Sequence, residues 1–386
     1  MQRQVVLALL IALGASLAEA QRTQNLVLVT ADGLRWQEVF RGAEDVLLAD
    51  EQAGMKDAAE LRRRFGTGGP SQRRARLMPF LWEVVARKGA LFGNRDRGGE
   101  VVMRNPHRFS YPCYAELLTG RPQEAVTSNE LRPNPSPTVL ELLRRHWRLR
   151  REQVALFGSW EVFAGIGAHE PESIFINAGY RSVELTGASA RLRELSRIQF
   201  ELLTPWRGVR HDYITFEMAL EYLRTVRPRV LYVALGETDD WAHDRRYDRY
   251  LETAHYFDQC LRRLWEALEG EAQYRGRTTM LVATDHGRGQ TREDWVRHGA
   301  AVEGSQYVWL AAVGAGVQPL GETGADQRLT LSDLAPTLLE LAGADYRQLV
   351  GVEGRPITAL IGHRRACAPE RPHLARRVAR GRIGGR

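Results

Sequence analysis

The sequence predicts an α/β fold in which helices cover both faces of an open, mostly parallel sheet, and three observations favour it. Short runs of apolar and β-branched residues recur along the chain and have the length of buried strands. Segments with helical spacing of their apolar residues lie between these runs. Polar residues follow several of the runs, at the strand ends where open α/β sheets bind ligands.

Six apolar runs are the predicted strands, and three segments are the clearest helices. The strands are residues 25–30, 154–158, 173–176, 230–235, 278–284 and 307–313. One helix is predicted to begin at Ser136 and Pro137 and to run through Arg145, because serine caps helices and proline suits their first turn. Residues 248–268 are long and amphipathic, and residues 332–342 end before a glycine that suits a helix C-terminus.

The N-terminal segment has the pattern of a cleaved secretory signal. Arg3 supplies a positive charge, residues 5–17 are apolar, and Ala18 and Ala20 flank a small-x-small cleavage site. We therefore predict that residues 1–20 are a signal peptide. The protein is expected to be exported, periplasmic or extracellular, with no transmembrane segment in the mature chain.

The basic charge of the chain is concentrated at its C-terminus. The formal net charge is +7, and residues 363–386 hold eight arginines and one glutamate, which accounts for the whole excess. This segment has no apolar periodicity and is predicted to be a disordered tail. The charge therefore does not indicate a specific nucleic-acid partner.

Residues 21–362 are predicted to form one large domain. Two stretches in it, near residues 41–99 and 165–210, fit the alternation of strands and helices poorly and are predicted to be insertions or a cap over the site. The chain has three cysteines, and this odd number excludes a scaffold built on disulfides. The oligomeric state is not predicted by these patterns.

Side chains that bind metals gather after the predicted strands. In chain order they are Asp32, Ser110, Asp239, His243, Asp285, His286 and His298. Each one alone is also typical of a turn, a helix cap or a surface pair. Because parallel strands bring their following loops to one edge of a sheet, we expect these side chains to form a single site. Mixed Asp and His ligation favours zinc first and manganese second.

In this arrangement the sequence resembles the alkaline phosphatase superfamily, and the branch that it resembles most is the type I phosphodiesterase/nucleotide pyrophosphatase family. The resemblance covers about residues 25–361. The Ser-x-Pro segment at 110–112, with Thr-Gly at 119–120, is similar to the family's nucleophile segment. The Asp-x-x-x-His segment at 239–243 and the Asp-His-Gly segment at 285–287 are similar to its two ligand segments.

The resemblance implies two divalent metal ions and a serine nucleophile. By this likeness Asp239, His243 and His298 hold one ion, and Asp32, Asp285, His286 and the Ser110 oxygen hold the other. It also implies that Ser110 attacks the phosphorus of a small-molecule phosphate ester and forms a covalent phospho-enzyme. Asn129 corresponds to the family's amide that donates to a phosphoryl oxygen, although an asparagine in a turn fits the sequence equally well.

Departures from the family pattern leave the activity open. Cys113 and Tyr114 stand where nucleotide-cleaving members commonly have Asn and His, so a nucleotide preference does not transfer. Tyr114 also takes the place of the arginine that the sulfatase modification motif requires. The predicted function is a secreted, metal-dependent phosphodiesterase or phosphatase. The alternatives are a sulfatase-like hydrolase or a phosphoryl head-group transferase on the same core, or a non-catalytic binding protein.

Overall fold

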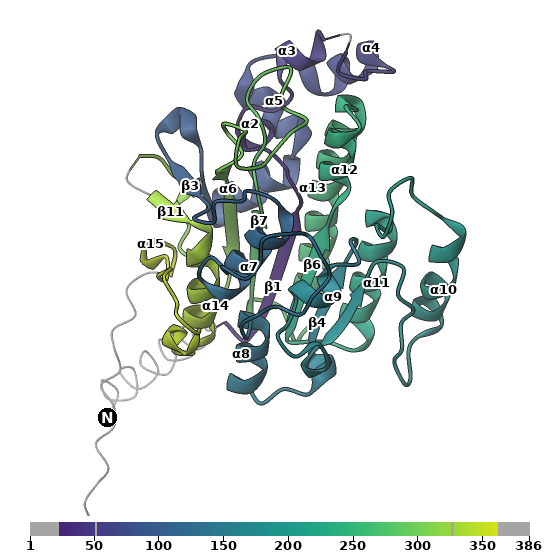
Figure 1. Cartoon of the computed structure of the whole chain (residues 1–386), viewed down its shortest axis with the longest axis vertical. Helices are drawn as coiled ribbons and strands as arrows, with labels where there is room; N and C mark the ends of the chain where they lie inside the picture. Colours follow the sequence, from purple (N-terminus) through teal and green to yellow (C-terminus); the bar gives the residue numbers. More distant parts are fainter. Residues whose placement is uncertain (1–22, 51, 326–327, 362–386) are drawn as a thin grey trace, which may run out of the picture.

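The computed structural model describes residues 23–50, 52–325 and 328–361, and most of its strands join one mixed sheet (Figure 1). The sheet has eight strands in the order β10-β2-β9-β7-β1-β6-β4-β5. In that order their bounds are Gly321–Glu322, Ala90–Phe92, Leu310–Gly314, Thr278–Thr284, Asn25–Ala31, Val230–Leu235, Val154–Gly158 and Phe175–Ala178. Among these strands only β9 runs antiparallel to its neighbours. The predicted mostly parallel α/β sheet is therefore confirmed.

The central strand β1 is buried along its whole length, as its continuous apolar sequence predicts. It pairs in parallel with β6 and β7, and Val29 lies opposite Val233 and Val282. Alternate side chains of β1 point to opposite faces, so Val27 and Val29 belong to one apolar cluster and Leu26 and Leu28 to the other.

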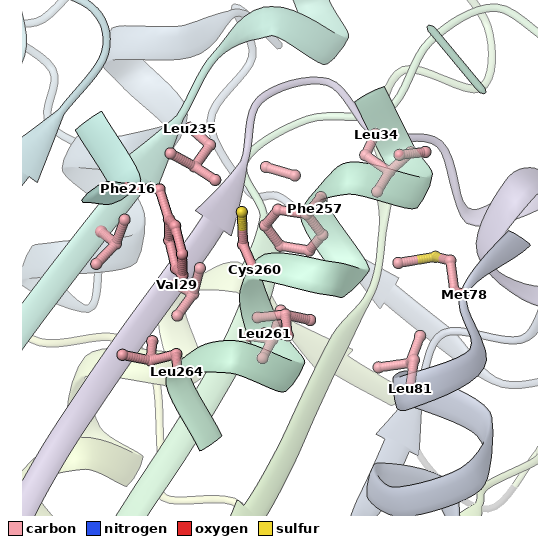
Figure 2. Packing of buried hydrophobic residues seen from close by; sticks show 14 of the residues in the cluster. Val29, Leu34, Met78, Leu81, Phe216, Leu235, Phe257, Cys260, Leu261 and Leu264 are labelled. Carbon is pink, nitrogen blue, oxygen red and sulfur yellow. The ribbon is translucent and has the colours of Figure 1, made fainter. Parts of the chain in front are cut away.

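Helices cover both faces of this sheet. On the face of Val29 lie α11 (Asp212–Thr225) and α13 (Tyr247–Gly270), and Figure 2 shows Phe257 and Leu261 of α13 packed beside that strand. On the other face lie α7, α8 and α14, with bounds Ser110–Thr119, Val139–His146 and Leu334–Ala342. Because helices cover both faces of the sheet, neither face of β1, β6 or β7 is exposed to solvent.

The remaining elements are short. The other α-helices are α2 (Trp36–Arg41), α3 (Asp45–Leu48), α4 (Ala58–Leu61), α5 (Pro70–Leu77), α6 (Ala86–Lys88), α9 (Phe163–Ile166), α10 (Ala190–Ile198), α12 (Glu237–His243) and α15 (Thr358–Ile361). The single turns of 3₁₀ or π helix are η1 (Arg62–Gly66), η2 (Leu81–Val85), η3 (Arg95–Arg97), η4 (Arg151–Gln153), η5 (Pro171–Ser173), η6 (Gln199–Glu201), η7 (Leu331–Asp333) and η8 (Tyr346–Gln348). A second sheet has the order β11-β3-β8, with bounds Arg328–Thr330, Glu100–Val102 and Tyr307–Val308.

Two of the predicted elements that differ from the structure have a clear physical reason. The run at 307–313 is divided at Trp309 between the two sheets, and the indole N–H of Trp309 donates to Leu34 O at 2.8 Å. The helix predicted to start at Ser136 starts at Val139 instead. Thr138 precedes it, and the backbone N–H of Thr138 donates to Glu141 Oε2 at 2.8 Å, which completes the first turn.

Both stretches predicted as insertions contribute a strand to the main sheet. Residues 41–99 include β2, and residues 165–210 include the edge strand β5 together with α10. The predicted signal peptide at 1–20 and the predicted tail at 363–386 lie outside the described residues. No helix within the described part of the chain has the length and apolarity needed to cross a membrane.

Candidate metal centre

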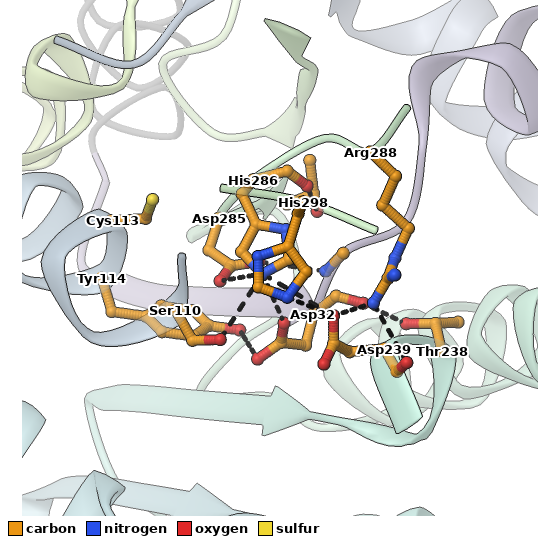
Figure 3. Close-up of polar contacts among 12 residues, drawn as sticks. Asp32, Ser110, Cys113, Tyr114, Thr238, Asp239, Asp285, His286, Arg288 and His298 are labelled. Carbon is orange, nitrogen blue, oxygen red and sulfur yellow. Dashed lines mark hydrogen bonds and ion pairs between the residues drawn. The ribbon is translucent and has the colours of Figure 1, made fainter. Parts of the chain in front are cut away.

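The carboxyl ends of three adjacent strands carry most of the predicted ligands. Asp32 follows β1, α12 follows β6, and Asp285 follows β7, so the pairing of these strands brings the three loops together. Figure 3 shows these side chains directed toward one another. The structure therefore brings these predicted side chains together at one edge of the sheet.

The first group consists of Asp32, Ser110, Asp285 and His286, and its side chains are fully or nearly fully buried. His286 Nε2 lies 3.2 Å from Asp32 Oδ1 and 3.5 Å from Asp285 Oδ2. Ser110 Oγ lies 3.4 Å from the same nitrogen. Ser110 is the first residue of α7 and follows a loop rather than a strand, so its hydroxyl enters the site from the N-terminus of a ten-residue helix.

The second group consists of Asp239, His243 and His298, and it lies beside the first. His243 Nε2 is 3.1 Å from Asp239 Oδ2 and 3.0 Å from His298 Nε2. His298 Nδ1 donates to Arg108 O at 3.2 Å, which leaves Nε2 as the ring nitrogen free to ligate. His286 Nε2 lies 3.7 Å from Asp239 Oδ1, so the two groups adjoin.

The electrostatics of both groups suit a divalent cation. Burial and the neighbouring carboxylates raise the pKa of Asp32 and of Asp285 well above the usual value. Asp32 Oδ1 and Asp285 Oδ2 are buried without a hydrogen-bond partner in the described structure. Burial, reinforced by His286, lowers the pKa of His298 to about 2, so this imidazole is neutral and able to bind a metal. Carboxylate oxygens without a hydrogen-bond partner beside imidazole nitrogens are the donor set expected of zinc or manganese.

Arg288 is a site residue that sequence reasoning missed. It is fully buried, its guanidinium contacts Asp239 Oδ1, and it donates to Asp239 O at 3.0 Å and to Val296 O at 2.7 Å. Burial alone would raise the pKa of Asp239, but Arg288 and His243 hold that pKa well below its usual value. The one available signal was its position, two residues after His286.

Two further neighbours of Asp32 were not predicted as site residues. The Tyr114 hydroxyl donates to Asp32 Oδ2 at 3.2 Å, and the Thr238 hydroxyl donates to Asp32 O. Gly33 has φ +58°, and a Cβ atom there would lie 2.8 Å from Asp239 Oδ1 and 2.9 Å from Arg288 Nε. The loop after β1 therefore approaches the second group too closely for any side chain at this position.

Asn129 lies at the N-terminus of α7. Its Oδ1 accepts a hydrogen bond from Tyr111 N at 3.0 Å, which orients the carboxamide. Within the described residues its amide nitrogen has no hydrogen-bond partner, and the residue is exposed. The backbone N–H of Tyr111, the residue after Ser110, therefore holds the carboxamide oxygen of Asn129. The N–H groups of this carboxamide remain available to a ligand.

Comparisons with known proteins agree with this architecture. A family model described as the metalloenzyme superfamily matches residues 211–346, which include Asp239, His243, Asp285, His286 and His298. No protein of curated function matches the chain in sequence. Two hundred and ninety chains of solved structures match its fold.

Three of these structures illustrate the likeness. Wild-type alkaline phosphatase PafA has TM-score 0.55 and 11% identity, over 88% of this chain and 99% of that one. A putative sulfatase from Bacteroides thetaiotaomicron has TM-score 0.55 and 15% identity, over 89% of this chain and 76% of that one. The phosphonate monoester hydrolase SpPMH from Silicibacter pomeroyi has TM-score 0.52 and 15% identity, over 90% of this chain and 78% of that one.

A metalloenzyme family model thus matches part of the chain, and the fold is shared with a phosphatase and with a phosphonate monoester hydrolase. The predicted resemblance to the alkaline phosphatase superfamily is confirmed as a likeness of fold. Two groups of described side chains could each hold a metal ion: Asp239, His286 and His298, and Asp32, Asp285 and His286. Phosphatase, sulfatase and phosphonate hydrolase structures share the fold, so the fold alone does not choose among their reactions.

Proposed function

We propose that this protein is a two-metal hydrolase of phosphoric esters, a phosphodiesterase or phosphatase, in which Ser110 is the nucleophile. The observation that carries the proposal is the position of Ser110 Oγ, 3.4 Å from His286 Nε2 and beside the buried carboxylates of Asp32 and Asp285. A serine hydroxyl buried among metal-ligand side chains is placed for activation as a nucleophile.

The ligand sets of the proposal are those that the resemblance implies. Asp239, His243 and His298 hold one ion, and Asp32, Asp285, His286 and Ser110 Oγ hold the other. Zinc is proposed first and manganese second. When bound, two such ions stabilise the charge on the attacking and leaving oxygens of a displacement at phosphorus.

The other roles belong to residues of this chain. Ser110 Oγ forms a bond to phosphorus while the bond from phosphorus to the leaving ester oxygen breaks, and water later cleaves the phosphoserine. The N-terminus of α7 favours negative charge on Ser110 and on the phosphoryl group. Asn129, anchored through its oxygen on Tyr111 N, donates its amide N–H to a phosphoryl oxygen.

The site favours phosphate over sulfate as the substrate class. Tyr114 occupies the position of the arginine in the sulfatase modification motif, and it is buried with its hydroxyl on Asp32. Serine is therefore proposed as the nucleophile in its unmodified form. Export to the periplasm or the extracellular space, with cleavage after Ala20, is part of the same proposal.

The test is an ester panel with the full mature chain, loaded with zinc or with manganese. 4-Nitrophenyl phosphate and bis(4-nitrophenyl) phosphate should be hydrolysed, and 4-nitrophenyl sulfate should be a poor substrate. Acid quenching during turnover should trap phosphoserine at Ser110. Preferred hydrolysis of the sulfate, or turnover in protein that elemental analysis shows to be free of metal, would overturn the proposal.

A further inference from the structure

Arg108, two residues before Ser110, has an unusual backbone conformation. Four described residues other than glycine have positive φ, and all four are arginines: Arg108, Arg148, Arg227 and Arg245. The last three directly follow the C-terminal ends of α8, α11 and α12, where a left-handed residue commonly ends a helix. Arg108 has φ +56° but precedes α7, so helix termination does not explain its conformation. A strained residue of this kind is typical of functional sites.

Asn105 holds Arg108 in this conformation. Asn105 is buried, and its Oδ1 accepts hydrogen bonds from His107 N at 3.2 Å and from Arg108 N at 3.0 Å. Its own backbone N–H and its Nδ2 donate to Glu116 Oε2 at 2.8 Å and 2.9 Å. Glu116 is fully buried in α7 and has no ion pair among the described residues, so hydrogen bonds alone satisfy its carboxylate. The loop before Ser110 is thus tied back to the helix that Ser110 begins.

Arg108 also joins this loop to the loop that carries His298. The carbonyl oxygen of Arg108 accepts a hydrogen bond from His298 Nδ1 at 3.2 Å. Its guanidinium Nη1 donates to Ala300 O at 3.4 Å and to Gln306 Oε1 at 3.2 Å. Figure 3 shows Ser110 and His298 in the same cluster of side chains. One residue therefore contacts the loop of a candidate ligand while its chain leads into the proposed nucleophile.

Both connections depend on the sign of φ at Arg108. Rotation about its N–Cα bond moves everything that follows in the chain, which includes its carbonyl group and the start of α7. At negative φ the carbonyl oxygen would turn away from His298, or α7 would begin elsewhere and carry Ser110 with it. The left-handed conformation is therefore what allows one residue to serve both side chains.

We propose that Arg108 is a positioning residue whose left-handed backbone, held by Asn105, fixes His298 and Ser110 relative to each other. Its carbonyl keeps the ring proton of His298 on Nδ1 and so leaves Nε2 for the second group. Its backbone also sets where the chain enters α7, and with it the place of the Ser110 hydroxyl. The roles of His298 as a ligand and of Ser110 as a nucleophile belong to the proposed function, on which this step rests.

Arg108→Val tests the backbone, because a β-branched residue is strongly disfavoured at positive φ. In the full mature chain, chelator competition followed by elemental analysis should show one of two zinc ions bound about 10- to 100-fold more weakly. At saturating zinc, acid quenching during turnover of 4-nitrophenyl phosphate should show phosphoserine forming about 100-fold more slowly, because the nucleophile is misplaced.

Two further variants separate the backbone from the side chain and from general strain. Arg108→Gly removes the guanidinium but adopts positive φ readily, so it should bind both zinc ions nearly as the wild type does. Arg148→Val puts the same strain at φ +52°, after α8. It should lower the unfolding temperature as Arg108→Val does, without changing zinc affinity or phosphoserine formation. Equal zinc loss in the glycine and valine variants of Arg108 would assign the role to the guanidinium and overturn the proposal.

A double-mutant cycle tests the role of Asn105. Asn105→Ala removes the acceptor for Arg108 N and should weaken the same zinc ion. Because Asn105 is proposed to act through Arg108, adding Asn105→Ala to Arg108→Val should cause little further loss, whereas independent effects would add. Additive losses would overturn this part of the proposal. Unfolding temperatures above the assay temperature show that each variant is folded.

The outcomes also separate this proposal from the proposed function. Unchanged zinc affinity and unchanged phosphoserine formation in Arg108→Val overturn the positioning role. Weaker zinc binding with unchanged phosphoserine formation at saturating zinc overturns the part that concerns Ser110. A wild type that binds two zinc ions but forms no phosphoserine overturns the hydrolase mechanism instead, and the zinc measurements then still decide how Arg108 acts on His298.

Discussion

The guanidinium of Arg288 contacts Oδ1 of Asp239, while His243 Nε2 lies 3.1 Å from Oδ2 of the same carboxylate. The two oxygens of Asp239 therefore have different partners. Arg288 also donates to Val296 O, two residues before His298, so it links α12 to the loop that carries another candidate ligand. We infer that Arg288 is a positioning residue that leaves one oxygen of Asp239 for a metal ion.

Arg288→Gln should weaken one metal site and spare the other. Removing a group that orients a ligand typically costs about 10- to 100-fold in metal affinity. Competition with a chelator, followed by elemental analysis, should show the loss of about one of two bound ions. The control is Arg210→Gln, which removes another fully buried arginine that donates to Asn177 Oδ1 at 2.8 Å. This control should lower stability without changing metal stoichiometry; equal metal loss in both variants would assign Arg288 a general structural role.

Ser110→Ala should abolish the phospho-enzyme while leaving metal content unchanged. Removal of a nucleophile typically lowers the rate by several orders of magnitude, about 10³-fold or more. Ser110→Thr keeps the oxygen and should retain measurable activity. The control is Cys113→Ala, because burial raises the pKa of this neighbouring thiol well above its usual value and makes it a poor nucleophile. Near wild-type turnover of Ser110→Ala across phosphate mono- and diesters would show that water attacks directly.

The position of the site could be predicted from the sequence because it depends on β1, β6 and β7. Their continuous apolar runs indicate buried parallel strands, and parallel strands place their following residues together. Asp32 and Asp285 directly follow β1 and β7, and Asp239 lies in α12 after β6, whereas their role as metal ligands stays a prediction. By contrast, the apolar run at 307–313 gave no sign that the chain changes sheets at Trp309, since periodicity does not specify a strand's partner.

Arg288 and the start of α8 show a second limit of prediction from the sequence. An arginine in a polar loop is usually exposed, and only the packed structure reveals that Arg288 is buried against Asp239. Before α8, Ser136 and Thr138 are both acceptable caps. Glu141, three residues after Thr138, decides between them by accepting the Thr138 N–H, a signal that was present in the sequence.

Asp258 is expected to make stability depend on pH. Burial raises its pKa to about 7, although it accepts hydrogen bonds from Phe80 N at 2.7 Å and Leu81 N at 2.8 Å. An acid whose pKa is higher in the folded state stabilises that state at low pH, and this contribution is lost as the pH rises from the ordinary value toward 7. Urea unfolding of metal-free protein at about pH 5 and about pH 8 should show a smaller pH difference for Asp258→Asn than for the wild type. An identical difference in both proteins would mean that Asp258 is ionised throughout.

Gly33→Ala should disrupt the metal centre through a direct clash. Gly33 has φ +58°, and the new Cβ would lie 2.8 Å from Asp239 Oδ1, 2.9 Å from Arg288 Nε and 3.1 Å from His286 Cε1. Gly276→Ala is the matched control, because Gly276 has φ +64° but nothing within 4 Å of its Cβ position. Both variants pay the strain of a left-handed alanine, about 1–2 kcal/mol, in the free energy of unfolding. Only Gly33→Ala should also lose metal affinity in a chelator titration, since only its Cβ meets Asp239. If the two variants bind metal equally well, the loop after β1 has room to move, and Gly33 is required for its backbone conformation alone.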